Sequence, residues 1–183
     1  MARVTWLRPD ADRGNARIDD VLAVLDAALQ AVDPARAIRH LVVESENSLW
    51  IDGVAYELDR FERVFVVGAG KAGASMANAV EELLGERITA GMVNVKYGYT
   101  APTNTIRVHE AGHPVPDAAG VAGTQAMVDL LHDTTADDLV LCLISGGGSA
   151  LLTLPVDGVT LEDIQTLTDL LLRSGAPIQA INA

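Results

Sequence analysis

Hydrophobic residues recur at helical spacing near the start of the chain and gather into short apolar runs further on. Residues 18–32 and 34–41 carry the helical pattern, and residues 48–58 alternate around Asp52-Gly53, a dipeptide typical of a tight hairpin turn. This first part of the chain is therefore predicted to form an N-terminal helical pair followed by a small β-hairpin.

From residue 63 onward, apolar runs of strand length alternate with stretches of helical composition. The expected strands are 63–67, 91–96, 106–110 and 139–144, and the expected helices are 72–84, 117–131 and 160–172. Strands joined by helical crossovers run parallel and are covered by helices. We therefore expect a Rossmann-like, doubly wound α/β fold, with a mainly parallel sheet and helices on both faces. Residues 1–183 are predicted to form one such domain, a length suited to a single core.

Composition favours an aliphatic core and excludes some classes of partner. Hydrophobic residues make up 49% of the chain but aromatic residues only 4%, which suits a parallel sheet. The formal charge of −12 argues against binding to nucleic acid or to an anionic membrane. The single cysteine, Cys142, cannot form an internal disulfide and is expected to be buried in its apolar run. Without a secretion signal or a membrane-spanning run, a cytoplasmic location is predicted.

A glycine-rich turn follows the first strand of the α/β region. Gly68, Gly70 and Gly73 match the G-x-G-x-x-G spacing of dinucleotide-binding domains. A dinucleotide site also needs an acidic residue at the end of the second strand, where this chain has Lys96. Lys71, inside the turn, suits a phosphate or a carboxylate better, and the spacing of a P-loop is absent. A tight turn without any ligand is the alternative interpretation.

Four of the expected strands end in sequence that is suited to binding a ligand. These ends are residues 68–71, 96–99, 110–117 and 145–149. Because the carboxyl ends of parallel strands meet at one edge of a sheet, all four should line one rim. Glycine turns that open helices offer N–H groups to anions, and Lys71 and Lys96 add positive charge. His113 or Asp117 could hold a hydroxyl group or a metal, although Asp117 is equally suited to capping the next helix.

The second glycine turn carries two serines, but neither is expected to be a nucleophile. Ser145 and Ser149 lack the G-x-S-x-G elbow and suit phosphate binding better. Lys96 has the alternative role of a solvated strand end, and no set of metal ligands is assigned. The predicted phosphate- or substrate-binding residues are Gly68, Gly70, Lys96, His113, Asp117, Ser145, Gly146, Gly147, Gly148 and Ser149.

Five blocks, in order along the chain, resemble one known family. They are Val-Val-Gly-Ala-Gly-Lys-Ala from Val66, Lys-Tyr-Gly from Lys96, Glu-Ala-Gly-His-Pro-Val-Pro-Asp from Glu110, Ile-Ser-Gly-Gly-Gly-Ser-Ala-Leu from Ile144, and Leu-Leu-Arg-Ser-Gly-Ala from Leu171. Together they are similar to the N-terminal domain of glycerate kinases of the glycerate 2-kinase type. The resemblance extends over residues 18–183.

The resemblance implies an activity, its cofactors and a catalytic residue. The activity is phosphorylation of glycerate by ATP with Mg²⁺, giving 2-phosphoglycerate rather than 3-phosphoglycerate, in a cleft between this domain and a C-terminal domain of the same polypeptide. Lys71 matches the catalytic lysine of the family. Phosphoryl transfer depends on positioning and on stabilisation of charge, which an ammonium beside backbone N–H groups would provide.

The sequence departs from the family in two places. Tyr99 stands where many members have histidine, and the chain ends where the family continues, after residues 181–182, into the domain that supplies an arginine and the far wall of the cleft. The resemblance therefore implies a fragment that is inactive by itself.

Two other functions stay open at this point. The G-x-G-x-x-G spacing and the related substrate fit an NAD(P)H-dependent hydroxypyruvate reductase, and a non-catalytic domain that binds a phosphorylated metabolite is a third interpretation. A homo-oligomer also stays open, as does the question of which glycine turn holds ATP and which holds glycerate.

Overall fold

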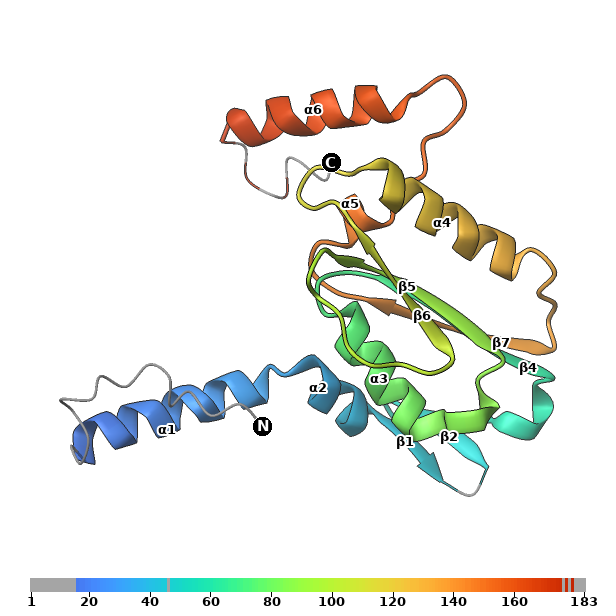
Figure 1. Ribbon diagram of the computed structural model, residues 1–183. Coiled ribbons are helices and arrows are strands. Elements are labelled where there is room, and N and C mark those ends of the chain that lie inside the picture. The colour runs from blue at the N-terminus through green and yellow to red at the C-terminus, as the bar shows by residue number, and fades with distance from the viewer. Residues whose placement is uncertain (1–15, 46, 176, 178, 180–183) are drawn as a thin grey trace.

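The computed structural model describes residues 16–45, 47–175, 177 and 179; residues 181–182, cited above for the family resemblance, lie outside them. In chain order the elements are α1 (Ala16–Ala31), α2 (Pro34–Leu41), β1 (Val42–Ser45), β2 (Ser48–Ile51), β3 (Val54–Glu57), the 3₁₀ turn Leu58–Arg60, β4 (Arg63–Ala69), α3 (Gly73–Leu84), the 3₁₀ turn Gly85–Arg87, β5 (Ala90–Lys96), β6 (Ile106–Ala111), α4 (Ala118–Leu131), β7 (Asp138–Ile144), α5 (Gly148–Leu151) and α6 (Leu161–Arg173) (Figure 1).

The centre of the molecule is a four-stranded parallel sheet in the order β6-β5-β4-β7. Helix α3 covers one face, where Ala74, Ala77 and Val80 pack with Val66 and Val93. Helix α4 covers the other face, where Met127 packs on Val67 and Met92. Figure 1 shows the two helices on opposite sides of the strands. The predicted α/β class, with a parallel sheet and helices on both faces, is confirmed.

Glycine brings the backbones of β4 and β7 close together near the end of β4. Gly68 is buried, and a Cβ atom added there would overlap the carbonyl oxygen of Leu143, its partner in the register. No other residue has so small a side chain, so this position is a packing requirement of the strand pair.

The N-terminal part contains the predicted helices and hairpin, together with one strand that the sequence analysis missed. Asp33 caps α2 by accepting a hydrogen bond of 2.8 Å from the backbone N–H of Arg36. Asp52 and Gly53 form the hairpin turn with φ angles of 47° and 80°. The missed strand, β1, pairs antiparallel with β2 and makes a three-stranded sheet. It follows α2 without a turn residue between them, so no local signal marked its start.

The prediction that Cys142 is buried is wrong. Successive side chains of a strand point to opposite faces of the sheet, and at the edge strand β7 only one face is well covered. Leu139 and Leu143 are therefore buried, whereas Val140 and Cys142 are exposed. An apolar run does not distinguish a strand covered on both faces from one covered on a single face. Within the described residues, no helix is long and apolar enough to cross a membrane.

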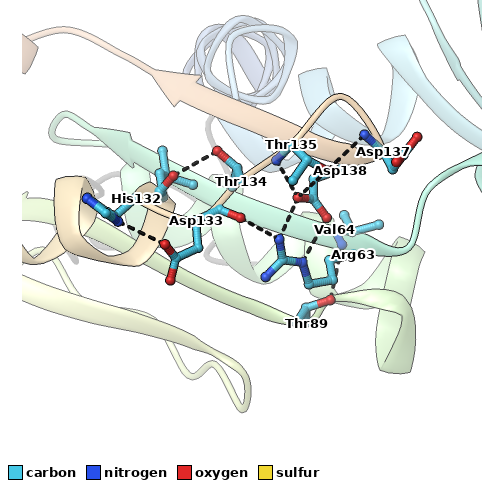
Figure 2. A network of polar contacts seen from close by, with 10 residues as sticks. Arg63, Val64, Thr89, His132, Asp133, Thr134, Thr135, Asp137 and Asp138 are labelled. Carbon is cyan, nitrogen blue, oxygen red and sulfur yellow. Dashed lines mark hydrogen bonds and ion pairs between the residues drawn. The ribbon is translucent and has the colours of Figure 1, made fainter.

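A charged pair joins the amino ends of β4 and β7 (Figure 2). Arg63 donates to both carboxylate oxygens of Asp138, at 2.8 and 2.7 Å, and to the carbonyl oxygen of Asp133 at 2.8 Å. The backbone N–H of Thr135 donates to the same carboxylate at 2.8 Å. The hydrogen bond from Arg63 and that from Thr135 lower the pKa of Asp138 to about 2. Since Arg63 and Asp138 are register partners, the pair holds the two strands in alignment.

Replacing Asp138 by Asn should remove stability in a pH-dependent way. The folded-state pKa of about 2 lies below the ordinary value of 3.8. The contribution of the ionised group is therefore present above pH about 4 and is lost as the pH falls from about 4 to about 2. We expect the difference in free energy of unfolding between wild type and Asp138→Asn, measured with urea, to be constant near neutrality and to shrink below pH about 4. A difference that persists unchanged to pH about 2 would contradict this.

Gly68→Ala should destabilise the domain because its methyl group would overlap the backbone of Leu143. We expect a loss of about 1–3 kcal/mol or more in urea unfolding, as for other overpacked cores. Gly148→Ala is the matched control, since its Cβ would lie 3.6 Å from its nearest neighbours. Equal effects of the two substitutions would show that the close approach of the strands is unimportant.

Candidate functional site

The carboxyl ends of the four parallel strands meet at one edge of the sheet. Ala69 is paired with Asn94 on one side and with Ile144 on the other, and Lys96 is paired with Ala111. The four predicted segments that follow these strands are thus brought to one rim. What each segment binds stays a prediction, but their common placement is a property of the fold.

The two glycine turns are joined to each other by hydrogen bonds. The N–H of Lys71 donates to the carbonyl oxygen of Gly146 at 3.0 Å, and the N–H of Ala72 donates to Ser145 Oγ at 3.1 Å. In the opposite direction, the N–H of Ser145 donates to the carbonyl oxygen of Ala69 at 3.1 Å. A side chain at Gly70, whose φ is +138°, would overlap Ser145 Oγ. The close contact between Gly70 and Ser145 therefore holds the two turns against each other.

This arrangement uses the N–H groups of residues 70–73 within the protein. Besides Lys71 and Ala72, Gly70 donates to the carbonyl oxygen of Asn94 and Gly73 donates to that of Gly70, both at 3.0 Å. These N–H groups were predicted to face a ligand, but they face protein atoms. Gly68 and Gly70 are thus explained by close packing.

The second turn keeps donors free. The N–H of Gly148 donates to the carbonyl oxygen of Ser145 at 3.2 Å. Within the described residues, the N–H groups of Gly146 and Gly147 donate to no protein atom. Gly147 adopts a left-handed conformation with φ of 92°. Two adjacent backbone donors are therefore available at the rim beside the first turn.

Lys71 and His113 lie against this second turn. The Lys71 side chain is exposed, and its Cε lies 3.5 Å from the position that a Cβ of Gly147 would occupy. His113 Nε2 is 2.8 Å from the same position. Any side chain at residue 147 would push against the imidazole. Glycine at this position allows a lysine, a histidine and two free N–H groups to gather in one place.

Electrostatics at this cluster favours an anion. Burial lowers the pKa of His113, and the positive charges of Lys71 and Lys96 lower it further. The imidazole is therefore neutral at neutral pH, and the two lysines place positive charge near it. A bound anion would offset the repulsion that the lysines exert on a protonated His113.

Asp117 acts as the N-cap of α4, the alternative considered from sequence. It accepts hydrogen bonds from the N–H of Gly120 at 2.9 Å and from the Tyr97 hydroxyl at 2.8 Å. Burial raises the pKa of Asp117, but hydrogen bonds from the Gly112 and Gly120 N–H groups and from Tyr97 lower it overall. The carboxylate is thus ionised and engaged.

Lys96 ends β5, half-buried, with its Nζ 5.3 Å from the centre of the Tyr99 ring. This is a cation–π distance. Tyr99, at the position where many family members are expected to have histidine, therefore contacts Lys96. Among the residues that the structure describes, no group of three or more His, Cys, Asp or Glu side chains could hold a metal ion.

One polar residue at the rim was missed by the sequence analysis. Asn94 is completely buried in β5, and its side chain donates to groups in α4 and α5. The signal was present, since an amide interrupts the apolar residues 91–95.

The fold and the rim define a class: an α/β domain in which two glycine turns and two lysines lie at the carboxyl edge of a parallel sheet. More specifically, the chain belongs to the family described as "Domain of unknown function (DUF4147)", whose model matches residues 20–183.

The chain is similar to proteins named as glycerate kinases. It is 40% identical over 161 residues to the glycerate 2-kinase of Pyrococcus horikoshii and 40% identical over 162 residues to the D-glycerate 2-kinase of Thermotoga maritima. Each match covers 88% of this chain and 36% of the relative. An Agrobacterium vitis protein, named provisionally as a hydroxypyruvate reductase, is 44% identical over 121 residues, covering 66% of this chain and 31% of its own.

A solved structure supports the same relationship. A crystal structure of a Pyrococcus horikoshii OT3 protein superposes with a TM-score of 0.77 at 40% identity, covering 88% of this chain and 36% of that chain. The resemblance stated from the sequence motifs is confirmed. The chain spans about a third of the length of the first two relatives, 36% in each case.

Lys71→Met should raise the pKa of His113 toward its ordinary value of 6.5, because one of the two lysine charges that lower it is removed. We would follow the His113 ring protons by NMR across a pH series. Arg39→Met is the matched control, since Arg39 pairs with Glu82 at 2.6 Å and does not contribute to the shift. An unchanged His113 midpoint in Lys71→Met would show that the two side chains do not share a site.

Proposed function

We propose that this domain forms one wall of the active site of a glycerate kinase, which transfers the γ-phosphoryl group of ATP to glycerate. Two relatives that carry glycerate 2-kinase names support this proposal. The observation that carries it in this chain is the cluster of Lys71, His113 and the free N–H groups of Gly146 and Gly147. We propose 2-phosphoglycerate as the product, and the cytoplasm as the location, since a lone cysteine suits a reducing compartment.

In this proposal Lys71 is the catalytic residue. Its exposed side chain extends over the second glycine turn, so its ammonium is available to the equatorial oxygens of a transferring phosphoryl group or to the carboxylate of glycerate. A phosphoryl group in transit has negative charge spread over those oxygens. A fixed cation that meets this charge lowers the barrier because little reorganisation is needed when the reaction occurs.

The second glycine turn supplies the neutral donors. The N–H groups of Gly146 and Gly147 would bind anionic oxygens, with Ser149 and neutral His113 at the border and Lys96 adding charge. Ser145 and Gly148 would shape the turn, because their own backbone donors are used within the protein. Asp117 would act through the loop that carries His113, by capping α4.

ATP would bring Mg²⁺ to the site. Magnesium in kinases is held largely by substrate phosphates and water, with few protein carboxylates, which agrees with the lack of a metal cluster in the described residues. When bound, the ion would neutralise phosphate charge. We further propose that a C-terminal domain of the same polypeptide closes the other side of the cleft and supplies an arginine.

A hydroxypyruvate reductase is the second candidate, and one relative's provisional name favours it. Two observations weigh against dinucleotide binding at the G-x-G-x-x-G turn. The N–H groups of residues 70–73 all donate within the protein, and β5 ends in Lys96 where an acidic residue would bind a ribose. Titration of NADH fluorescence decides between the two, because a reductase should change it at micromolar cofactor.

Lys71→Met should lower turnover about 10²–10³-fold, the usual cost of removing one transition-state donor. We would measure ADP release with D-glycerate, ATP and Mg²⁺ on the complete gene product. Arg87→Met, which removes a cation remote from the rim that donates to Asn47, is the matched control and should keep wild-type turnover. Near-normal turnover in Lys71→Met would remove Lys71 from the catalytic role.

A further inference from the structure

Asn94 has the most deeply buried polar side chain among the described residues, with no exposed surface. Its Nδ2 donates to the carbonyl oxygen of Leu151 at 2.8 Å, and to the carbonyl oxygen of Gly120 and the hydroxyl of Thr124 at 3.3 Å each. Its Oδ1 has no partner. Turning the amide over would place that oxygen against two carbonyl oxygens, so the acceptors fix its orientation.

The groups that Asn94 contacts belong to the segments around the candidate site. Leu151 ends α5, the short helix that continues from the turn with Gly146 and Gly147. Gly120 lies in the first turn of α4, directly after the loop that carries His113. The backbone carbonyl oxygen of Asn94 accepts from the N–H of Gly70, next to Lys71. One residue is thus bonded to all three segments.

Helix α4 approaches the sheet closely enough for these bonds because of its glycines. A Cβ at Gly123 would overlap Asn94 Oδ1. Helix α5 has four residues, too few to be stable by itself, so its position depends on contacts with the rest of the domain. Its apolar contact is small, since Leu151 packs with Ala69, Ala111 and Ala119. Apolar packing of this kind does not determine where the Leu151 carbonyl lies.

An amide is a costly residue for this place in the core. It buries an acceptor with no partner, which an aliphatic side chain of the same volume would avoid. Local departures of this kind from good core packing are expected where function requires them. What the amide provides is a pair of donors directed at the two helices that border the rim.

We propose that Asn94 is a positioning residue, whose side-chain amide fixes the turn of Gly146 and Gly147 relative to His113 and Lys71 without contacting the bound anion. The kinetic part of this proposal rests on the proposed kinase function. The structural part does not, and the two are tested separately.

The test uses two variants of the complete gene product. Asn94→Leu keeps the volume and removes the donors, and Asn94→Asp keeps the shape but places an oxygen where Nδ2 donates. In both, amide hydrogen exchange over residues 146–152 should be about tenfold faster or more, because opening of the turn becomes easier. With glycerate, ATP and Mg²⁺, kcat should fall about tenfold or more while KM changes little, because misplaced groups lose transition-state contacts.

Met92→Ala is the matched control, because Met92 lies on the same strand, is buried to the same degree and packs on Val67 and Met127 away from the rim. It should lower the melting temperature but leave kcat per folded molecule and exchange at residues 146–152 unchanged. Wild-type exchange and kcat in Asn94→Leu would overturn the proposal.

A measurement on the wild type decides the matter if neither variant folds. The side-chain amide protons of Asn94 should exchange with solvent as slowly as buried backbone amides, and fast exchange would overturn the proposal. If the wild type does not phosphorylate glycerate, the proposed function fails, while hydrogen exchange still decides whether Asn94 positions the turn.

Discussion

The close approach of β4 and β7 is the constraint on which the rest of the structure depends. Gly68 and Gly70 carry no side chain, so the backbone of β4 can lie against Leu143 and the turn after it can lie against Ser145. At the other end of the two strands, Arg63 and Asp138 hold the register with paired hydrogen bonds. With both ends fixed, the turns that leave the two strands meet at the carboxyl edge. Any ligand site at this edge follows from that alignment.

Two glycine turns of similar composition have different physical roles. In the first, the N–H groups from Gly70 to Gly73 are used to join the turn to β5, to the second turn and to itself. In the second, Gly146 and Gly147 keep their N–H groups free beside Lys71 and His113. The G-x-G-x-x-G spacing therefore reflects close packing in this chain. The first turn carries Lys71, and the second carries two N–H groups without a protein acceptor among the described residues.

Most of the fold could be predicted because turns and periodicity are local properties. The glycine turns and apolar runs located every strand and the three long helices of the α/β region, and parallel pairing placed the strand ends at one rim. Other features depend on tertiary contacts that no local pattern reveals. The exposure of Cys142 follows from the edge position of β7, β1 depends on pairing with β2, and the bonds of Asn94 depend on how closely α4 approaches. Free and occupied N–H groups likewise look identical in a sequence.

The central claim is that the rim formed by Lys71, His113 and the second glycine turn serves phosphoryl transfer to glycerate. The most direct test is phosphorus NMR of the complete gene product with D-glycerate, ATP and Mg²⁺, which identifies the product as well as its formation. The account predicts ADP together with 2-phosphoglycerate. No consumption of ATP by folded protein, or conversion of hydroxypyruvate that requires NADH or NADPH, would contradict it.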